Sequence, residues 1–329
     1  MPVLGALRRL VMAPSLEEVS FSGRGFAVRD DERARRLEAV PQAVVTGFEW
    51  GIEDRDLATT ERRLNLVDPE QRGFAYEGAT MACAVRDAMG RSGHRTRDLL
   101  TGGGRPHIFL NYIGIGFAMA KLPRPLWKKL VPDLSGPAYY PQMSWLCVDG
   151  YGFDRAYFDT DTWVTRQRLD DPYAWDGDPS YWRRAFDQGV GRALWFIHGG
   201  HAGHVVAAVR AFAGDRQADL WSGVGLAATF AGGSTPAELA LLREEARSDL
   251  GHLAQGSVFA AKARHHAGFV PAHTEAAVEA FTGLSAEAAA LLADDCAPAA
   301  VRSATAPAYE GWRTGVRERL TTLSSVEHI

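Results

Sequence analysis

Four aspartates gather in one aromatic segment of the sequence, where carboxylates can carry out acid–base chemistry. Asp149, Asp154, Asp159 and Asp161 lie among tyrosines, phenylalanines and tryptophans between residues 143 and 163. An apolar setting raises the pKa of a carboxyl group, which can then act as a general acid near neutral pH. The same oxygens can chelate Mg²⁺, or serve as turn and helix-cap residues. We predict Asp149 and Asp154 as the catalytic candidates of this segment.

A second candidate is a glutamate that recurs along the chain as glutamine. Glu77-Gly78, Gln188-Gly189 and Gln255-Gly256 stand at corresponding places in three similar stretches. Only Glu77 is ionisable, so it is the copy that can act as an acid or a base. The structural alternative is a long polar side chain that bridges helix ends. Arg192, one turn after the second copy, can pair with a carboxylate or a bound anion, or form a structural salt bridge.

Three histidines have a spacing typical of metal ligands. In His198-x-x-His201-x-x-His204, imidazoles recur at helical intervals, but three glycines between them interrupt the helix that would align them. No cysteine or glutamate is close by in the sequence. We therefore predict no metal site and no cofactor, and retain His198 as a catalytic candidate. A metal enzyme built on this triplet stays open as a weaker alternative.

The elements that must position these side chains are mainly helices. Apolar residues recur at helical spacing from Phe74 to Met89 and from Tyr181 to His198, and little after residue 50 resembles a strand. The motifs Gly114-Ile115-Gly116 and Gly223-Val224-Gly225 lie inside apolar helical stretches. Because a glycine inside a helix costs about 1 kcal/mol relative to alanine, each pair needs a reason. Close helix packing and room for a ligand are the two candidates.

The same signatures recur in the same order, which indicates internal duplication. The unit consists of three helices: one starts at Glu/Gln-Gly, one ends in Phe-x-Gly and one carries Gly-x-Gly. A third copy has Leu291–Asp295 in place of the last motif, as terminal repeats are often atypical. Coincidence in an Ala/Gly-rich chain is the alternative. We predict a mainly-α, helical-repeat-like fold with a small α/β or irregular N-terminal segment, in which Arg24–Arg29 alternates like a short strand.

The predicted organisation has four parts. They are an N-terminal segment (1–50), a first repeat unit (51–130), an aromatic and acidic linker or lid (131–175), and the second and third repeat units (176–329).

Large aromatic residues stand beside the glycines of these motifs. These rings, Phe117 among them, are either ordinary core or the walls of a cavity for an extended apolar molecule. The predicted substrate-binding residues are Tyr76, Tyr112, Gly114, Gly116, Trp145, Arg192, Trp195, Trp221, Gly223 and Gly225.

Composition narrows the class of protein. The 329 residues are 46% hydrophobic with a net charge of -4, so the chain can build a large core and offers no overall basic surface for nucleic acid. The cysteines Cys83, Cys147 and Cys296 are odd in number and widely spaced, which favours a reducing cytoplasm. In Met1–Val11 the arginines lie within the apolar run, unlike in an export signal, and no stretch is long enough to span a membrane.

Four long runs of the sequence resemble one known family. These runs are Arg72–Met81, Tyr112–Ala120, Asp149–Phe158 and Gly191–Gly200. They look like the UnbL-type proteins, a family of uncharacterised function also described as domain of unknown function 1702. The resemblance covers nearly the whole chain, and it implies a place among actinobacterial gene clusters for enediyne polyketides and related metabolites. It implies no catalytic residues.

The resemblance and the residues together give two expectations of different classes. In the first, a cytoplasmic biosynthetic protein takes a linear polyene or polyyne polyketide into an aromatic-lined cavity and promotes its isomerisation or cyclisation without a classical redox cofactor. Acid–base work then falls to Glu77, or to Asp149 and Asp154. In the second, the protein is a non-catalytic carrier, or docks other pathway proteins or a second copy of itself. Polar side chains that point away from the cavity favour the second.

Overall fold

The computed structural model describes residues 9, 12–90, 93–134, 141–297 and 306–326. Over these residues the chain is built from helices and contains no strand, which confirms the mainly-α prediction. The stretch Arg24–Arg29 is a turn followed by an irregular segment, so the N-terminal region takes the irregular form. Most of Met1–Val11 lies outside the described residues.

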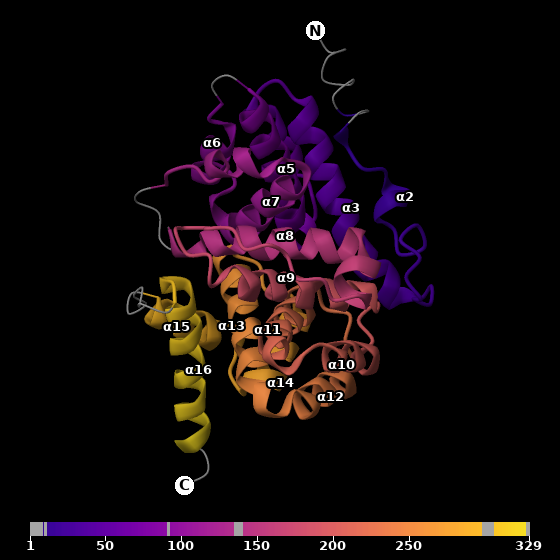
Figure 1. Cartoon of the computed structure of the whole chain (residues 1–329), viewed down its shortest axis with the longest axis vertical. Helices are drawn as coiled ribbons and strands as arrows, with labels where there is room; N and C mark the ends of the chain where they lie inside the picture. The colour runs from indigo at the N-terminus through magenta and orange to yellow at the C-terminus, as the bar shows by residue number, and fades with distance from the viewer. Residues whose placement is uncertain (1–8, 10–11, 91–92, 135–140, 298–305, 327–329) are drawn as a thin grey trace.

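Seven long helices form a row in which each one packs on the next in the row. Figure 1 shows α3, α5 and α7 in the upper part of the molecule, α8 and α9 across the middle, and α11 and α13 below. The row consists of α3 (Glu32–Glu53), α5 (Pro69–Met89), α7 (Ile108–Lys121), α8 (Trp145–Phe158), α9 (Trp182–Ile197), α11 (Gly214–Ala231) and α13 (Leu250–His266).

Glycines allow these helices to cross at very short range. A Cβ added to Gly114 would lie 2.1 Å from the carbonyl oxygen of Glu77 on α5, and one added to Gly116 would lie 2.1 Å from that of Cys147 on α8. One glycine of the motif therefore faces the preceding helix and the other faces the next. Since no side chain fits, close packing accounts for the helix-weakening glycines.

The same arrangement recurs from helix to helix. Gly223 faces the carbonyl of Gln188 on α9 at 2.0 Å, and Gly225 faces that of Leu253 on α13 at 2.0 Å, again measured from an added Cβ. Helices α8 and α9 also carry Gly-x-Gly, at 150–152 and 189–191, with the same division of roles. The close crossings thus repeat on consecutive long helices, and not only once in each predicted three-helix unit.

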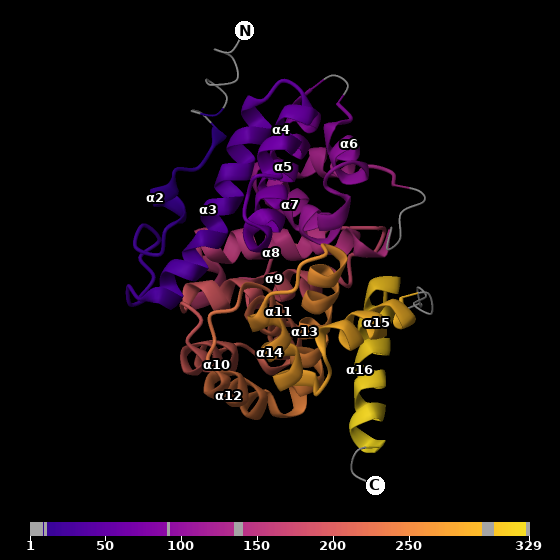
Figure 2. The same ribbon diagram turned by 180° about the vertical axis from the view of Figure 1, so that it is seen from behind.

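Shorter helices flank the row and cover its ends, as Figure 2 shows from behind. They are α2 (Leu16–Val19), α4 (Leu57–Leu64), α6 (Arg95–Thr101), α10 (Ala202–Ala211), α12 (Pro236–Ala246), α14 (Ala272–Thr282), α15 (Ala286–Cys296) and the longer C-terminal α16 (Ala308–Val326). Short 3-10 or π turns occur at η1 (Arg105–His107), η2 (Arg124–Lys129), η3 (Gln142–Ser144), η4 (Asp161–Thr165) and η5 (Arg247–Asp249).

The sequence specifies where several helices begin. The Asp31 side chain accepts a hydrogen bond from the Ala34 backbone at the start of α3, and Asp68 caps α5 directly before Pro69. Helix α3 runs through residue 50, and the segment 131–175 contains the buried helix α8. The four-part division of the chain stays a prediction.

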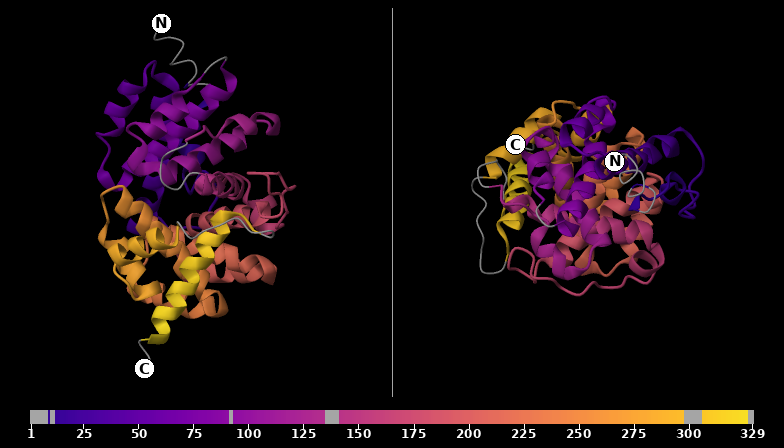
Figure 3. Two further views of the ribbon diagram at one scale, coloured as in Figure 1. Left: turned by 90° about the vertical axis from the view of Figure 1, so that its left-hand side faces the viewer. Right: turned by 90° about the horizontal axis from the view of Figure 1, so that it is seen from above.

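The C-terminal helix α16 is held against the row by a buried ion cluster. Arg313 Nη1 donates to Asp219 Oδ1 at 2.9 Å and to Glu310 Oε2 at 2.6 Å. It also donates to the Tyr181 hydroxyl at 2.7 Å, and Arg184 Nε donates to Asp219 Oδ2 at 2.8 Å. We call Tyr181, Arg184, Asp219, Glu310 and Arg313 the α16 cluster. Figure 3 shows α16 in yellow beside the lower helices.

Helix length and composition bear on membrane insertion. No single helix in the described ranges is long and apolar enough to cross a membrane, and only the bent pair α14 and α15 passes that test together. Both helices of this pair pack on α13.

Candidate functional site

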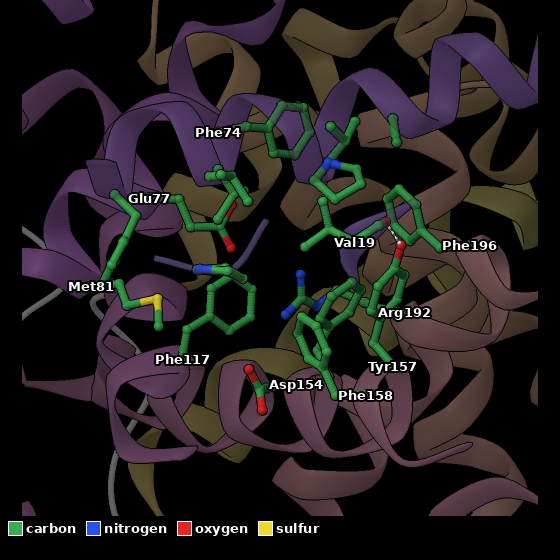
Figure 4. A pocket seen from close by; sticks show the side chains of 18 of the residues that line it. Val19, Phe74, Glu77, Met81, Phe117, Asp154, Tyr157, Phe158, Arg192 and Phe196 are labelled. Atoms are coloured by element: carbon green, nitrogen blue, oxygen red, sulfur yellow. Dashed lines mark hydrogen bonds between the residues drawn. The ribbon is translucent and has the colours of Figure 1, made fainter. Parts of the chain in front are cut away.

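An apolar cavity lies where the helices of the row meet the N-terminal segment (Figure 4). Its empty volume, counted together with adjoining space open to solvent, is about 860 Å³. Because its wall is mostly hydrocarbon, the cavity suits an apolar molecule. The apolar wall residues are Pro14, Val19, Val40, Pro41, Val44, Val45, Phe48, Phe74, Met81, Phe117, Phe153, Phe158, Phe196, Leu226, Ala227, Phe230 and Ala231.

The glycine motifs set which residues face this cavity. On four consecutive long helices, the residue after the second glycine of Gly-x-Gly lines the cavity, and so does the residue four positions later. Residues four apart share one face of a helix, so each crossing presents the same face. The pairs are Phe117 and Lys121 on α7, Phe153 and Tyr157 on α8, Arg192 and Phe196 on α9, and Leu226 and Phe230 on α11.

Glu77 is the polar residue that α5 contributes to the cavity. It lies between Phe74 and Met81 on one helix face and is only 3% exposed. Within the described part of the chain, its carboxyl group makes no hydrogen bond. Burial raises the pKa of Glu77 to about 8; Arg192 offsets part of this rise, and Asp149 adds to it. The group is therefore mostly protonated at neutral pH and close to the range where it can exchange a proton.

Arg192 reaches the cavity from α9 and is held from behind by Asp149. Its Nε donates to Asp149 Oδ1 at 2.6 Å, and Nη2 lies 2.5 Å from the same oxygen. The guanidinium stacks over the Phe153 ring at 5.0 Å. Burial raises the pKa of Asp149, while Arg192 counteracts the rise. Asp149 does not line the cavity, so its place is that of a residue that positions Arg192.

Asp154 lines a different part of the cavity, next to a lysine. Lys121 Nζ lies 3.7 Å from Asp154 Oδ2, and the lysine side chain is 44% exposed whereas that of the aspartate is 7% exposed. Burial raises the pKa of Asp154, against the effect of Lys121. This pair gives the cavity one polar, solvent-facing edge. We call Glu77, Lys121, Asp149, Asp154 and Arg192 the cavity cluster.

The N-terminal segment forms one wall of the cavity. Pro14 and Val19 line it, and the Tyr157 hydroxyl donates to the Val19 carbonyl at 2.6 Å. Arg24 donates to the backbone carbonyls of Tyr157, at 3.3 Å, and of Phe158. These bonds fix the short helix α2 and the turn that follows it over the end of α8.

The other predicted substrate-binding aromatics are buried away from this cavity. Tyr76 stacks on His107, with ring centroids 4.7 Å apart, and Trp195 donates to the Gly232 carbonyl at 3.0 Å. They occupy other faces of the helices whose cavity face is described above. Of the aromatics that the sequence suggested, Phe117 lines the cavity, and the others are core residues outside it: Tyr76, Tyr112, Trp145, Trp195 and Trp221. The predicted glycines Gly114, Gly116, Gly223 and Gly225 lie at helix crossings.

His198 also lies outside the cavity, at the end of α9. Burial lowers its pKa to about 4, helped by His204 and His201. The rings of His198 and His204 are 6.2 Å apart, and those of His201 and His204 are 5.6 Å apart. No group of three His, Cys, Asp or Glu side chains in the described ranges is arranged to hold a metal ion.

The structure thus brings the predicted residues Glu77, Asp154 and Arg192 together at one cavity, most of whose wall the sequence reasoning did not identify. The missed signal was the register of Gly-x-Gly, which marks Phe153 and the residues one turn later on each helix. Chemically, the site offers a protonated carboxyl group and a guanidinium inside an apolar enclosure, where hydrogen bonds and charges act strongly.

The chain was compared with known proteins. No curated protein and no solved structure matches it. One family model, described as a protein of unknown function (DUF1702), matches residues 3–320. Because this match spans almost the whole sequence, including every helix of the row, the chain belongs to the DUF1702 family.

Proposed function

We propose that the protein binds a linear hydrophobic polyene or polyyne in the cavity and promotes its isomerisation or cyclisation. The proposal places it in the cytoplasm, in an enediyne-type polyketide pathway, because the four runs quoted above resemble the UnbL-type proteins. The DUF1702 family is described as having no known function. The proposed reaction is therefore argued from the residues of the cavity alone.

One observation carries the proposal: a carboxyl group stands unbonded inside an apolar cavity. Burying a polar group without a partner costs about 1–3 kcal/mol in proteins, which a purely structural residue would avoid. Glu77 is buried and faces the cavity, and no hydrogen bond to its carboxyl group occurs in the described residues. A bound guest is the natural partner for such a group.

The chemistry assigned to the site is proton transfer. With its pKa near 8, Glu77 can both give and take a proton at physiological pH. Arg192, oriented by Asp149, stabilises negative charge that develops on the guest. The apolar walls restrict a flexible chain to a few conformations, which brings reacting carbons together and contributes to the rate.

A carrier without catalysis is the second candidate function. The wall of the cavity is mostly hydrocarbon, and the N-terminal segment closes one side of it through Tyr157 and Arg24. Such an enclosure would protect a reactive polyene from water and from other molecules. The same non-catalytic class includes a protein that docks other pathway proteins or a second copy of the chain.

The test is to incubate the purified protein with the product of the cognate polyketide synthase and follow it by mass spectrometry and ultraviolet absorption. We expect a product of unchanged mass with a shifted absorption spectrum, because isomerisation and cyclisation move bonds without changing composition. Tight binding with an unchanged spectrum supports the carrier, and absence of binding contradicts both functions.

A further inference from the structure

Two hydrogen-bond donors face the cavity without a partner. Arg192 uses Nε and Nη2 for Asp149, and no hydrogen bond of its Nη1 occurs in the described part of the chain. The protonated Glu77 carboxyl group is the other donor. Both side chains line the cavity and interact electrostatically, but they form no ion pair with each other.

The register of the glycine motifs makes Arg192 an exception that the fold does not require. At the position after the second glycine, the other three helices carry Phe117, Phe153 and Leu226, which fill the wall with hydrocarbon. Only α9 places a charge there, with Asp149 beneath it to balance the charge. Replacing such a pair by hydrophobic residues is often neutral or stabilising, so packing does not explain it.

We infer that the guest carries a carbonyl group whose oxygen binds between Glu77 and Arg192. This inference rests on the proposed function and narrows its substrate class to chains with a ketone, aldehyde or thioester carbonyl next to the unsaturated segment. Two donors that face one apolar cavity can both bind an acceptor atom, as the donors of an oxyanion hole do in acyl-transfer enzymes.

The charges at the site favour a neutral acceptor. Asp149 already balances Arg192, and Asp154 stands opposite Lys121, so a guest carboxylate would bring an uncompensated negative charge into the apolar enclosure. An ammonium group would be repelled by the Arg192 guanidinium. A carbonyl oxygen accepts two hydrogen bonds and adds no charge.

The same geometry supports a balanced proton shift. In the molecules whose Glu77 is ionised, the carboxylate takes a proton from the carbon next to the carbonyl, and the C–H electron pair delocalises onto the carbonyl oxygen, which Arg192 alone then stabilises. Glu77 then returns this proton to the carbon at the far end of the adjacent double bond. The double bond moves by one carbon into conjugation, and no atom or electron is gained or lost.

The test uses two linear trienes with the same number of carbons, one ending in a methyl ketone and the other a hydrocarbon. Equilibrium dialysis gives the affinity of each, and Raman spectroscopy gives the carbonyl stretching frequency of the bound ketone. We expect the ketone to bind at least about tenfold more tightly, since a hydrogen bond to a charged group is worth about that much or more. Its carbonyl band should move to lower frequency on binding.

Variants separate the inference from the proposed function. Glu77→Leu and Arg192→Lys should reduce the preference for the ketone, whereas Glu77→Gln keeps a donor and should retain it. Equal affinity for the two trienes, or an unshifted carbonyl band in the unmodified protein, overturns the carbonyl inference but leaves the cavity as a binding site. If neither triene binds, the proposed function fails with it. The band shift needs no variant, so a variant that does not fold leaves the test intact.

Discussion

Two clusters of buried charges in this protein differ in how fully the protein itself satisfies them. In the α16 cluster, the carboxylates of Asp219 and Glu310 accept hydrogen bonds from Arg313 and Arg184. In the cavity cluster, Glu77 has no hydrogen-bond partner among the described residues. The side chains of Glu77, Asp219 and Glu310 are all buried. Burial alone therefore does not distinguish a structural charge from a functional one.

The pKa values follow the same division. Burial alone would raise the pKa of Asp219 and of Glu310, but Arg313 and Arg184 outweigh it and hold both below their ordinary values. Burial prevails for Glu77 and Asp154, whose pKa values are raised. A carboxyl group kept ionised by arginines is fixed in place, whereas one kept near its titration point can react.

The largest expected effect tests whether Glu77 takes part in the reaction, unlike the structural carboxylates Asp219 and Glu310. Glu77→Gln preserves the shape and burial of the side chain but cannot exchange a proton. Conversion of the polyene should fall about 10²–10⁴-fold, the usual contribution of a general acid or base, while the free energy of unfolding at pH 7 does not fall, because the variant lacks the group whose raised pKa costs stability at that pH. Conversion is measured by ultraviolet absorption, and unfolding by urea titration.

The matched control is Glu279→Gln, the same substitution on the exposed face of α14. It should alter neither the conversion of the polyene nor the free energy of unfolding. A Glu77→Gln protein that converts the polyene normally but unfolds more easily would place Glu77 with the structural charges and remove the distinction.

The next effect concerns stability and comes from the α16 cluster. Arg313→Met leaves Asp219 and Glu310 buried with fewer partners, which should lower the free energy of unfolding by about 3–5 kcal/mol. Arg184→Met removes a 40%-exposed partner of the same carboxylates and should cost about 1 kcal/mol or less. Urea titration of both variants checks the order. Equal losses would show that the cluster is not organised around Arg313.

A smaller effect tests whether the two clusters are mechanically linked through α9. This helix carries Arg192 toward the cavity and Gln188, which donates to Asp219 at 3.0 Å, toward α16. In Gly223→Ala the new methyl group would lie 2.0 Å from the Gln188 carbonyl oxygen and force α9 and α11 apart. We expect a loss of about 1–3 kcal/mol in stability, together with weaker binding in the cavity.

Gly315→Ala on α16 provides the contrast. Its added methyl group would meet only Cys296, at 3.6 Å, which is an ordinary contact. Because alanine favours a helix over glycine, this variant should gain up to about 1 kcal/mol. If the Gly223→Ala protein is as stable as the parent, the crossing of α9 and α11 can accommodate the added methyl group. The two clusters would then not be linked through α9.

The sequence predicted the class of fold, the glycine motifs and three of the five polar residues that line the cavity. Glu77 could be found because it is the ionisable copy of a repeated position, and Arg192 because it stands one turn after the second copy, Gln188. The identity of the wall could not be found in the same way. Trp195 and Phe196 are adjacent and equally apolar, and only the crossing of α9 with its neighbours decides which one faces the cavity.

The pairing of charges was equally hidden from the sequence. Asp149 and Arg192 are 43 positions apart, and Asp219 and Arg313 are 94 positions apart. Composition around Asp149 suggested a free catalytic acid, whereas the packing of α8 on α9 turns it toward Arg192. The α16 cluster left no local signal at all, because its members come from three separate helices and one loop end.

The dependence of stability on pH distinguishes the two clusters without any substrate. The pKa of Glu77 is about 8 in the folded chain and ordinarily 4.5, so between these values the folded state binds more protons than the unfolded state. Raising the pH through this window therefore favours unfolding, by at most about 1.4 kcal/mol per pH unit for this group. Asp219 and Glu310 act in the opposite sense, since their lowered pKa values make stability fall as the pH falls.

Glu77→Gln isolates the first of these terms, because it deletes one titrating group and leaves Arg192, Asp149 and the α16 cluster in place. The stability of the variant relative to the parent should rise steadily from pH 5 to pH 8 and level off above, as measured by urea titration at each pH. A flat difference would mean that Glu77 is ionised in the folded chain at pH 5. It would then belong with Asp219 and Glu310, as a charge that the protein already satisfies.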